Sequence, residues 1–443
     1  MGAPWPTDSA PTRLPTVAEI EQAARRQRRP FRPIPAAHRL AFFVTIFAAL
    51  YLAFDVYMYV TRGLFLYVGV DYRSFWASAQ IARSAGFAAV YDLDLQRQLQ
   101  EPLVHAFASP LHELQWATIP TPYLPGFVAL LGPLLLLPPD LGFVVWTAVN
   151  VVMTLGYLVW FWRGVGGSAT RSLLLALCLS FPMLETFQFG QVNGWLTIFL
   201  GEFFRLAIAR AELRSGLWLS CMLLKPQTLM LIAPGLLVAR RWRAALGATA
   251  GGAGIVGISL AFGGIDALLA DARLIFLYSG HVPSTVPRDM MNWRSLAIHL
   301  SDALPAQLAW TLAMAGLVAT LVAGLALWLN ARDASPEQFA LVVLGSFAAT
   351  SAVAWHAHTH MGLPMTIPLL YLAARGRISI ATLAVWLIAP YVMFATLRLV
   401  FDLGNVGVLF VNLYLLGWSI AQLRSRASEE SATTVASIAQ ASP

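Results

Sequence analysis

The sequence is poor in charged residues and contains only two cysteines and one lysine. Charged side chains make up 12% of its 443 residues, whereas a soluble protein needs about 25% to cover its surface. Hydrophobic residues make up 58%, and the mean hydropathy is +0.66. This composition excludes a soluble protein of about three domains and predicts a protein that lies in a lipid bilayer.

The cysteines and the basic residues exclude two further classes of protein. Cys178 and Cys221 both lie in apolar segments, so the chain has neither a disulfide framework nor thiols spaced to hold a metal ion. The net charge is +7, but the basic residues collect at the ends of apolar runs rather than on one face. This pattern indicates membrane topology instead of nucleic-acid binding.

Apolar runs between Leu40 and Leu423 predict an all-α polytopic transmembrane protein. A helix needs about 20 residues to cross a bilayer, so the runs correspond to roughly eleven to thirteen membrane segments. Arg163 and Arg171 conflict with a simple order of crossings, so either one short run before residue 188 is re-entrant or both arginines lie at the outer interface. The runs lie at residues 40–61, 121–137, 141–162, 172–187, 192–210, 215–239, 243–263, 305–330, 338–355, 361–374, 378–398 and 403–422.

The distribution of arginine divides the chain into a leader, a membrane domain and a tail. Residues 1–39 contain seven arginines against three acidic residues, and several prolines, which predicts a disordered cytoplasmic leader. The membrane domain is expected over 40–422 and a cytoplasmic tail over 423–443, with outer loops at 62–120 and 264–294. Alanine-rich composition with arginine in place of lysine is typical of GC-rich bacterial genomes, so we expect a bacterial plasma (inner) membrane.

Asp71 follows the first apolar run by about ten residues and directly precedes a predicted helix. Residues 72–86 place Phe75 and Trp76 near one helical face, which predicts a short amphipathic helix at the membrane interface. A carboxylate held there beside aromatic groups is desolvated enough to act as a base toward a polar acceptor. The same carboxylate also suits the N-cap of the helix.

Lys225 is the only lysine of the chain, and Pro226 breaks the predicted helix immediately after it. A single ammonium group at a helix break suits an anionic ligand such as a lipid phosphate, although a lysine at the end of a span also reaches toward the interface. Residues 188–194 gather carboxamide side chains, among them Gln191 and Asn193. Such groups bind either the backbone at a helix break or the hydroxyls and phosphate of a ligand.

Glu185 and Glu202 each lie in an apolar run. Charged groups inside a membrane cost free energy and therefore mark either a substrate pathway or a paired site in the packing. The sequence treats the two carboxylates alike, and we expect packing for both.

His356, His358 and His360 lie in one short turn between apolar runs. A zinc site needs three or four ligands in tetrahedral arrangement, and no cysteine or well-spaced carboxylate accompanies the histidines. We expect the turn either to assist a phosphate leaving group by hydrogen bonding or proton transfer, or to end a helix structurally. Asn292 is expected to cap the run after the second outer loop, and Arg294 to anchor the interface or to hold a phosphate.

Taken in order, these features resemble glycosyltransferase family 87, whose members are polytopic enzymes of the GT-C fold. The family includes mannosyltransferases that use polyprenyl-phosphate mannose as the donor. The resemblance covers residues 40–400, and the histidine turn departs from the family pattern because Met361 stands where an aspartate often follows. The patterns that carry the resemblance are Asp71-Tyr72-Arg73-Ser74-Phe75-Trp76, Pro122-Tyr123-Leu124-Pro125, Gly190-Gln191-Val192-Asn193, Lys225-Pro226-Gln227 and the histidine turn before Pro364.

The resemblance implies an integral membrane hexosyltransferase that moves mannose or another hexose, with inversion, from a polyprenyl monophosphate to an acceptor hydroxyl on the extracytoplasmic face. In such a reaction Asp71 accepts the proton of the acceptor and His358 assists the departure of the phosphate. Lys225 and Arg294 hold that phosphate, and neither a metal ion nor another cofactor is implied, because a phosphomonoester is already a good leaving group. Further substrate-binding residues are expected at Tyr72, Gln191, Asn193, Asn292, His356 and His360.

The expected partners are the lipid-linked donor, a glycolipid or glycan acceptor and the lipid bilayer, but no nucleic acid. The main alternative function is a transporter or flippase of lipid-linked sugars, because broken helices and charges inside a membrane also mark transport pathways. The enzyme prediction requires Asp71 and Lys225 to share one cavity. Coordinates that place them in separate regions would refute it.

Overall fold

The computed structural model describes residues 35–65, 67–104, 118–165, 171–278 and 286–441. These residues form helices, and within them the only β-type pairing is an isolated bridge between Leu64 and Val68. The predicted all-α fold is therefore confirmed. Most of the predicted leader, residues 1–34, lies outside the described part of the chain.

Seven of the described helices are long and apolar enough to cross a membrane, and the chain is a multi-pass membrane protein. A bilayer offers the backbone no hydrogen-bonding partners, so apolar runs of this length form helices that satisfy their own N–H and C=O groups. The seven are α2 (Pro35–Arg62), α6 (Pro139–Gly164), α12 (Trp242–Tyr278), α14 (Ala306–Ala326), α15 (Pro336–Val353), α17 (Ile380–Met393) together with the turn that continues it to Arg398, and α18 (Val406–Ala441).

The number of spanning helices is smaller than the eleven to thirteen segments predicted, because several apolar runs form short or interrupted helices. Most of these contain a proline, which lacks a backbone N–H and interrupts or begins a helix. They are α5 (Pro125–Leu130), η4 (Gly132–Leu136), α10 (Glu212–Ser220), η5 (Cys221–Leu224), η6 (Pro226–Leu229), α11 (Ile232–Val238), η10 (Thr359–Met365) and α16 (Thr366–Ala374).

One further pair of helices forms an interrupted segment. α7 (Arg171–Cys178) and α8 (Phe181–Phe189) are together apolar enough for an eighth span, but they are bent by 43° at a short break. The next helix, α9 (Asn193–Ile208), follows directly. This break follows Arg163 and Arg171 and does not change their side. The run at 121–137 forms only the short α5 and η4, so α6 is the one long apolar helix described between the first outer loop and these arginines, which removes the conflict in the order of crossings.

The predicted outer loop 62–120 contains two helices and a turn. Its first helix, α3, differs from the expected surface helix because one side packs deep inside the protein, where Arg73 is fully buried and donates a hydrogen bond to the Phe65 carbonyl (2.6 Å). Because this face is buried, α3 forms a wall of the interior. The three elements are α3 (Val70–Ala85), η1 (Phe87–Tyr91) and α4 (Leu93–Val104).

The predicted second outer loop, 264–294, is helical over its first part, because α12 continues to Tyr278. The helix is bent at Gly264, which has a φ of 66° and a ψ of −176°. Glycine adopts this conformation without the steric cost that other residues pay. After the bend come the short elements η8 (Pro287–Asp289) and α13 (Trp293–Leu300).

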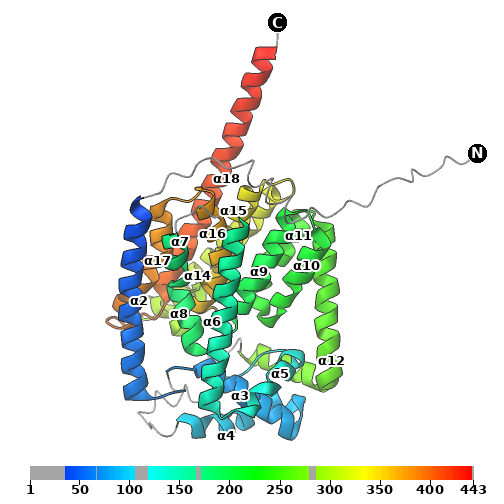
Figure 1. Ribbon diagram of the computed structural model, residues 1–443, viewed down its shortest axis with the longest axis vertical. Helices are drawn as coiled ribbons and strands as arrows, with labels where there is room; N and C mark the ends of the chain where they lie inside the picture. The colour runs from blue at the N-terminus through cyan, green and yellow to red at the C-terminus, as the bar shows by residue number, and fades with distance from the viewer. Residues whose placement is uncertain (1–34, 66, 105–117, 166–170, 279–285, 442–443) are drawn as a thin grey trace, which may run out of the picture.

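The elements of the first outer loop gather at one end of the helical bundle (Figure 1). In this view α3, α4 and α5 lie opposite the start of α2 and the projecting end of α18, which extends through most of the predicted tail to Ala441. Among the spanning helices α15 is the most buried and α12 the least. Since α15 runs through the middle of the protein, the histidine turn that follows it lies in the interior. Two further short elements are η9 (Leu327–Asn330) and η11 (Phe394–Arg398).

Candidate active site

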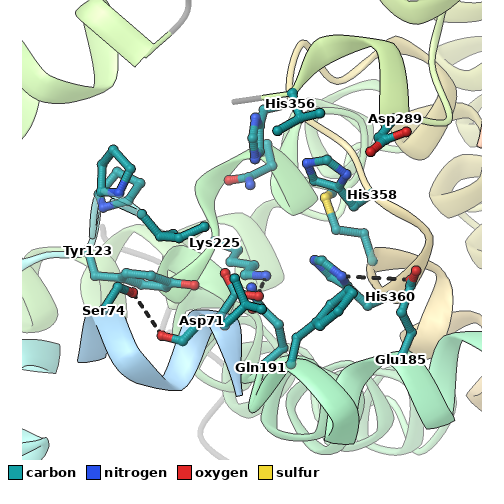
Figure 2. Close-up of a pocket in the computed structure, with 18 of the residues that line it drawn as sticks. Asp71, Ser74, Tyr123, Glu185, Gln191, Lys225, Asp289, His356, His358 and His360 are labelled. Carbon is teal, nitrogen blue, oxygen red and sulfur yellow. Dashed lines mark hydrogen bonds and ion pairs between the residues drawn. The ribbon is translucent and has the colours of Figure 1, made fainter. Parts of the chain in front are cut away.

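A cavity of about 500 Å³ lies between α3, the break before η6 and the histidine turn after α15. It collects residues from segments that are far apart in the sequence (Figure 2). Six of the ten predicted site residues line this cavity. They are Asp71, Gln191, Lys225, His356, His358 and His360.

The start of α3 determines the position of Asp71. Gly69 occupies the N-cap position in the left-handed conformation (φ 73°), and its N–H donates a hydrogen bond to the Gln188 carbonyl (2.7 Å). Asp71 therefore stands in the first helical turn, and its carboxylate faces the cavity rather than capping the helix. The hydroxyl of Ser74 donates to the Asp71 carbonyl (2.8 Å). The N-cap alternative for Asp71 is thus wrong.

Gly190 allows α8 and α3 to approach closely. It ends α8 in the left-handed conformation, with a φ of 73°. A Cβ atom at this position would lie 2.7 Å from the Cβ atom of Tyr72. The Gly190 carbonyl also accepts a hydrogen bond from the Trp146 indole (2.8 Å). The following residue, Gln191, is thereby held against the start of α3.

Lys225 and Asp71 are joined through Gln191. The Lys225 Nζ atom donates a hydrogen bond of 2.5 Å to Gln191 Oε1, and the Gln191 side chain also hydrogen bonds to the Asp71 carboxylate. The two charges therefore sit on opposite sides of one amide (Figure 2). Lys225 is in this position because Pro226 ends the preceding 3-10 helix and begins the next.

Burial changes the proton affinity of both charged groups. Removal from water raises the pKa of Asp71, while the nearby Lys225 ammonium, the Gln191 hydrogen bond and the Arg73 guanidinium lower it. Burial lowers the pKa of Lys225 to about 8, and the Asp71 carboxylate acts in the opposite direction. Desolvation penalises the charged form of each group. The pair is therefore more readily neutralised by proton transfer than the same residues in water.

The three histidines form a row across the cavity. The ring centroids of His356 and His358 are 4.9 Å apart, and those of His358 and His360 are 5.7 Å apart. Burial lowers the pKa of all three imidazoles, that of His358 to about 4. They are therefore neutral at pH 7, and each ring then has one N–H donor and one acceptor nitrogen. In the described part of the chain, no group of three or more His, Cys, Asp and Glu side chains is arranged to hold a metal ion.

Two of the remaining predicted site residues support the histidine turn from behind. Asn292 caps α13, as predicted, by accepting a hydrogen bond from the Ser295 N–H (2.9 Å). Its side-chain amide also donates to the carbonyl of Ala354 (2.8 Å), at the start of the turn. The guanidinium of Arg294 lies over the ring of Trp355, 4.9 Å from its centroid. Neither residue lines the cavity.

Tyr72 and Asn193 also lie outside the cavity lining. Tyr72 follows Asp71 on α3 but points away from the cavity, and its ring packs against Phe143 and Trp146. Asn193 is the first residue of α9 and is fully buried. All four residues outside the cavity lie at or near the start of a helix. Residues at such positions occur both in the wall of a cavity and in the packing behind it, so the sequence pattern does not distinguish the two.

The far side of the cavity is lined by polar residues that sequence reasoning did not select. Arg398 Nη2 lies 3.2 Å from Asp289 Oδ2, and the Asn405 amide donates to the Asp289 carbonyl (3.1 Å). Glu185 completes this group, and Tyr123 lines the cavity beside Asp71. The one sequence signal was the carboxylate of Glu185 inside an apolar run, which marks either a pathway or a packing site.

Comparison with known proteins gives a single family. Residues 121–354, just over half of the chain, match glycosyltransferase family 87. No curated protein and no solved structure matches the chain. The matched segment includes Gln191 and Lys225, and it ends immediately before the histidine turn.

Proposed function

The chain belongs to glycosyltransferase family 87, and we propose that it moves mannose or another hexose from a polyprenyl monophosphate to a hydroxyl of a glycolipid or glycan acceptor. The observation that carries this proposal is the shared cavity in which Asp71 and Lys225 bind the same amide, Gln191. The transfer needs a base for the acceptor and a cation for the leaving phosphate. A carboxylate and an ammonium group at one point supply both.

Asp71 is the proposed base. Burial brings its pKa closer to neutral pH, and a carboxylate with a raised pKa accepts a proton more readily in a transition state. The acceptor oxygen attacks the anomeric carbon as its proton passes to Asp71. The bond from that carbon to the phosphate oxygen breaks, and the electron pair leaves with the polyprenyl monophosphate. Displacement in one step inverts the configuration at the anomeric carbon.

Lys225 is the proposed ligand of the donor phosphate, and His358 its second hydrogen-bond donor. Both side chains line the cavity, whereas Arg294, the other candidate for the phosphate, lies behind Trp355. A low pKa keeps the His358 imidazole neutral, so its N–H donates a hydrogen bond without giving up a proton. Such a contact suits a phosphate leaving group, which departs without protonation.

We further propose that the active site faces the extracytoplasmic side of a bacterial plasma membrane. The arginine-rich residues before α2 favour a cytoplasmic start of that helix. α3, which carries Asp71, lies at the opposite end of the bundle (Figure 1). On that side the lipid-linked donor is available, whereas nucleotide sugars remain in the cytoplasm.

The decisive experiment is a transfer assay with the purified full-length protein. Labelled polyprenyl-phosphate mannose is incubated with the protein and a bacterial lipid extract, and new glycosides are separated from the donor. We expect the wild type to form a labelled product and Asp71→Asn to reduce the rate at least about 100-fold, the usual contribution of a general base. Asp94→Asn is the matched control, because Asp94 is a well-exposed residue of the neighbouring α4.

Two results would refute the proposal. One is an unchanged rate for Asp71→Asn, which would remove Asp71 as the base. The other is a wild type that carries the intact donor across vesicle membranes without forming a new glycosidic bond, which is the behaviour of a transporter. Transfer of other polyprenyl-phosphate hexoses in place of mannose would identify the sugar and leave the mechanism in place.

A further inference from the structure

The side of the cavity farthest from Asp71 contains hydrogen-bond acceptors that lack donors. Glu185 is 1% exposed, and within the described residues its Oε2 atom has no hydrogen-bond partner. The same holds for the Oδ1 atom of Asn405, which is 3% exposed. Both residues line the cavity. Buried polar atoms are almost always satisfied, so two such oxygens beside an open cavity indicate a ligand that donates hydrogen bonds.

The nearest cationic candidate does not satisfy Glu185. His360 Nδ1 lies 3.9 Å from the Glu185 Oε2 atom, which is too long for a hydrogen bond. Burial keeps the His360 imidazole neutral at pH 7. Arg398, the other basic group on this side, is already paired with Asp289. The free carboxylate oxygen is therefore left for a ligand.

The two sides of the cavity offer opposite chemistry. Figure 2 shows Asp71, Gln191 and Lys225 on one side and Glu185 on the other, with His360 between them. The Lys225 ammonium donates hydrogen bonds, and a phosphate accepts them. The side lined by Glu185 and Asn405 offers acceptors, which a phosphate diester cannot satisfy because it has no donor, whereas a sugar hydroxyl can.

We propose that Glu185 and Asn405 bind hydroxyl groups of the sugar that is being transferred, and so select a neutral, hydroxyl-rich hexose. The inference rests on the proposed function, which places the donor phosphate at Lys225 and the acceptor hydroxyl at Asp71. The anomeric carbon then lies beside both groups. The other ring carbons and their hydroxyls extend away from that point, past the histidine row toward Glu185.

The charges on this side disfavour an acidic sugar. The Arg398 guanidinium is paired with Asp289, so a ligand carboxylate would find no unpaired cation on this side and would lie beside two acidic residues, Glu185 and Asp289. Like charges in a buried site repel strongly. The site therefore recognises hydroxyl groups and discriminates against a uronic acid that differs from the hexose only at one carbon.

The test compares two phosphodiester lipids, one with and one without the sugar. Affinities of the full-length protein in nanodiscs are measured for methyl decaprenyl phosphate and for decaprenyl-phosphate mannose, whose phosphates carry the same single charge. The wild type is expected to bind the mannose-bearing lipid more tightly. Glu185→Gln is expected to lose about tenfold of that preference, the effect of losing one hydrogen bond to the carboxyl group, while its affinity for methyl decaprenyl phosphate is unchanged.

Glu202→Gln is the matched control. Glu202 is also a largely buried carboxylate of an apolar helix, but it pairs with Arg205 (2.7 Å) and Tyr157 (3.0 Å) and lies outside the cavity lining. This variant is expected to keep the preference for the sugar. Equal weakening of both lipids by Glu185→Gln would assign Glu185 a structural role and overturn the inference.

Deoxy analogues of the donor identify which molecule occupies the site. We expect removal of one particular mannose hydroxyl to weaken wild-type binding about tenfold and to have little effect on Glu185→Gln, since the partner is already lost. An unchanged sugar preference in Glu185→Gln would overturn this inference but leave the proposed function in place. A wild type that binds neither lipid would refute the proposed function as well, so the two failures are distinguishable.

Discussion

Lys225 is expected to give donor binding a defined dependence on pH. Its ammonium is the group proposed to hold the donor phosphate, and burial lowers its pKa to about 8. Below that pH the side chain is charged and binds the phosphate, and above it the side chain is neutral. A phosphodiester keeps its negative charge throughout this range. Donor affinity is therefore expected to be constant from about pH 6 to about pH 7 and to fall as the pH rises through the pKa.

The expected loss of donor affinity follows from the strength of the hydrogen bond between the Lys225 ammonium and the phosphate. A hydrogen bond to a charged group contributes about 1.5–3 kcal/mol, so complete loss of the ammonium weakens the Kd by about 10- to 150-fold. One pH unit above the pKa, about nine-tenths of the lysine side chains are neutral. At about pH 9 the donor is thus expected to bind roughly tenfold more weakly than at about pH 7.

The assay uses a phosphonate analogue of the donor, which is not cleaved, and measures its Kd for the protein in nanodiscs across this pH range. Lys225→Arg keeps its charge at every pH tested and is expected to remove the fall. Lys225→Met is expected to bind weakly at every pH. A wild-type affinity that does not change with pH would refute the assignment, and so would the same fall in Lys225→Met, because another group would then be titrating.

Three further predictions concern packing, support of the site and topology. Gly190→Ala brings a Cβ atom into Tyr72 and strains a left-handed backbone, so we expect thermal unfolding to show a loss of about 1–3 kcal/mol. Asn292→Ala removes a helix cap and a bond to the histidine turn, which should cost about 1–2 kcal/mol and lower the transfer rate. In a variant without native cysteines, an impermeant maleimide should label Asp94→Cys, on α4 at the proposed outer end, in intact cells. It should not label Asp333→Cys, which lies in the exposed turn between η9 and α15, at the end proposed to be cytoplasmic.

Matched variants separate these effects from general damage. Gly156→Ala is the control for glycine, because a Cβ atom there meets nothing within 4 Å, and it should unfold at the wild-type temperature or above. Ser379→Ala removes a comparable cap on α17, where Ser379 accepts from the Thr382 N–H (3.0 Å), and should leave the transfer rate unchanged. Equal losses in variant and control, or the reverse labelling pattern, would contradict the corresponding prediction.

The sequence predicted the class of fold because hydropathy reports directly on the solvent that each segment meets. Its count of spans was too high, since prolines such as Pro125 and Pro226 divide apolar runs into helices that are too short to cross a bilayer. The predicted loop 264–294 contains charged residues, among them Asp266 and Asp271, yet α12 continues as helix through both to Tyr278. Hydropathy alone does not show whether a charged residue interrupts a helix or lies within it.

Asp71 and Lys225 were identifiable because a charged side chain in an apolar segment costs free energy and is therefore expected to have a specific role. The structure places both in one cavity, as the enzyme prediction requires. Asn292 and Arg294 illustrate the limit of this reasoning. Both contact the start of the histidine turn, but on the side away from the cavity. The sequence alone does not show whether a residue lines a cavity or packs behind its lining.

Glu185 and Glu202 show what additional information the structure supplies. Both are carboxylates in apolar runs, and by sequence they have the same expected role. In the folded protein Arg205 lies one helical turn after Glu202 and neutralises it, whereas Glu185 has an oxygen without a hydrogen-bond partner and lines a cavity together with Asp289 and Arg398. These three residues come from distant parts of the chain, so only tertiary packing brings them together. A buried carboxyl group whose oxygens are all paired stabilises the packing, and we propose that one with an unsatisfied oxygen on a cavity-lining residue binds a substrate.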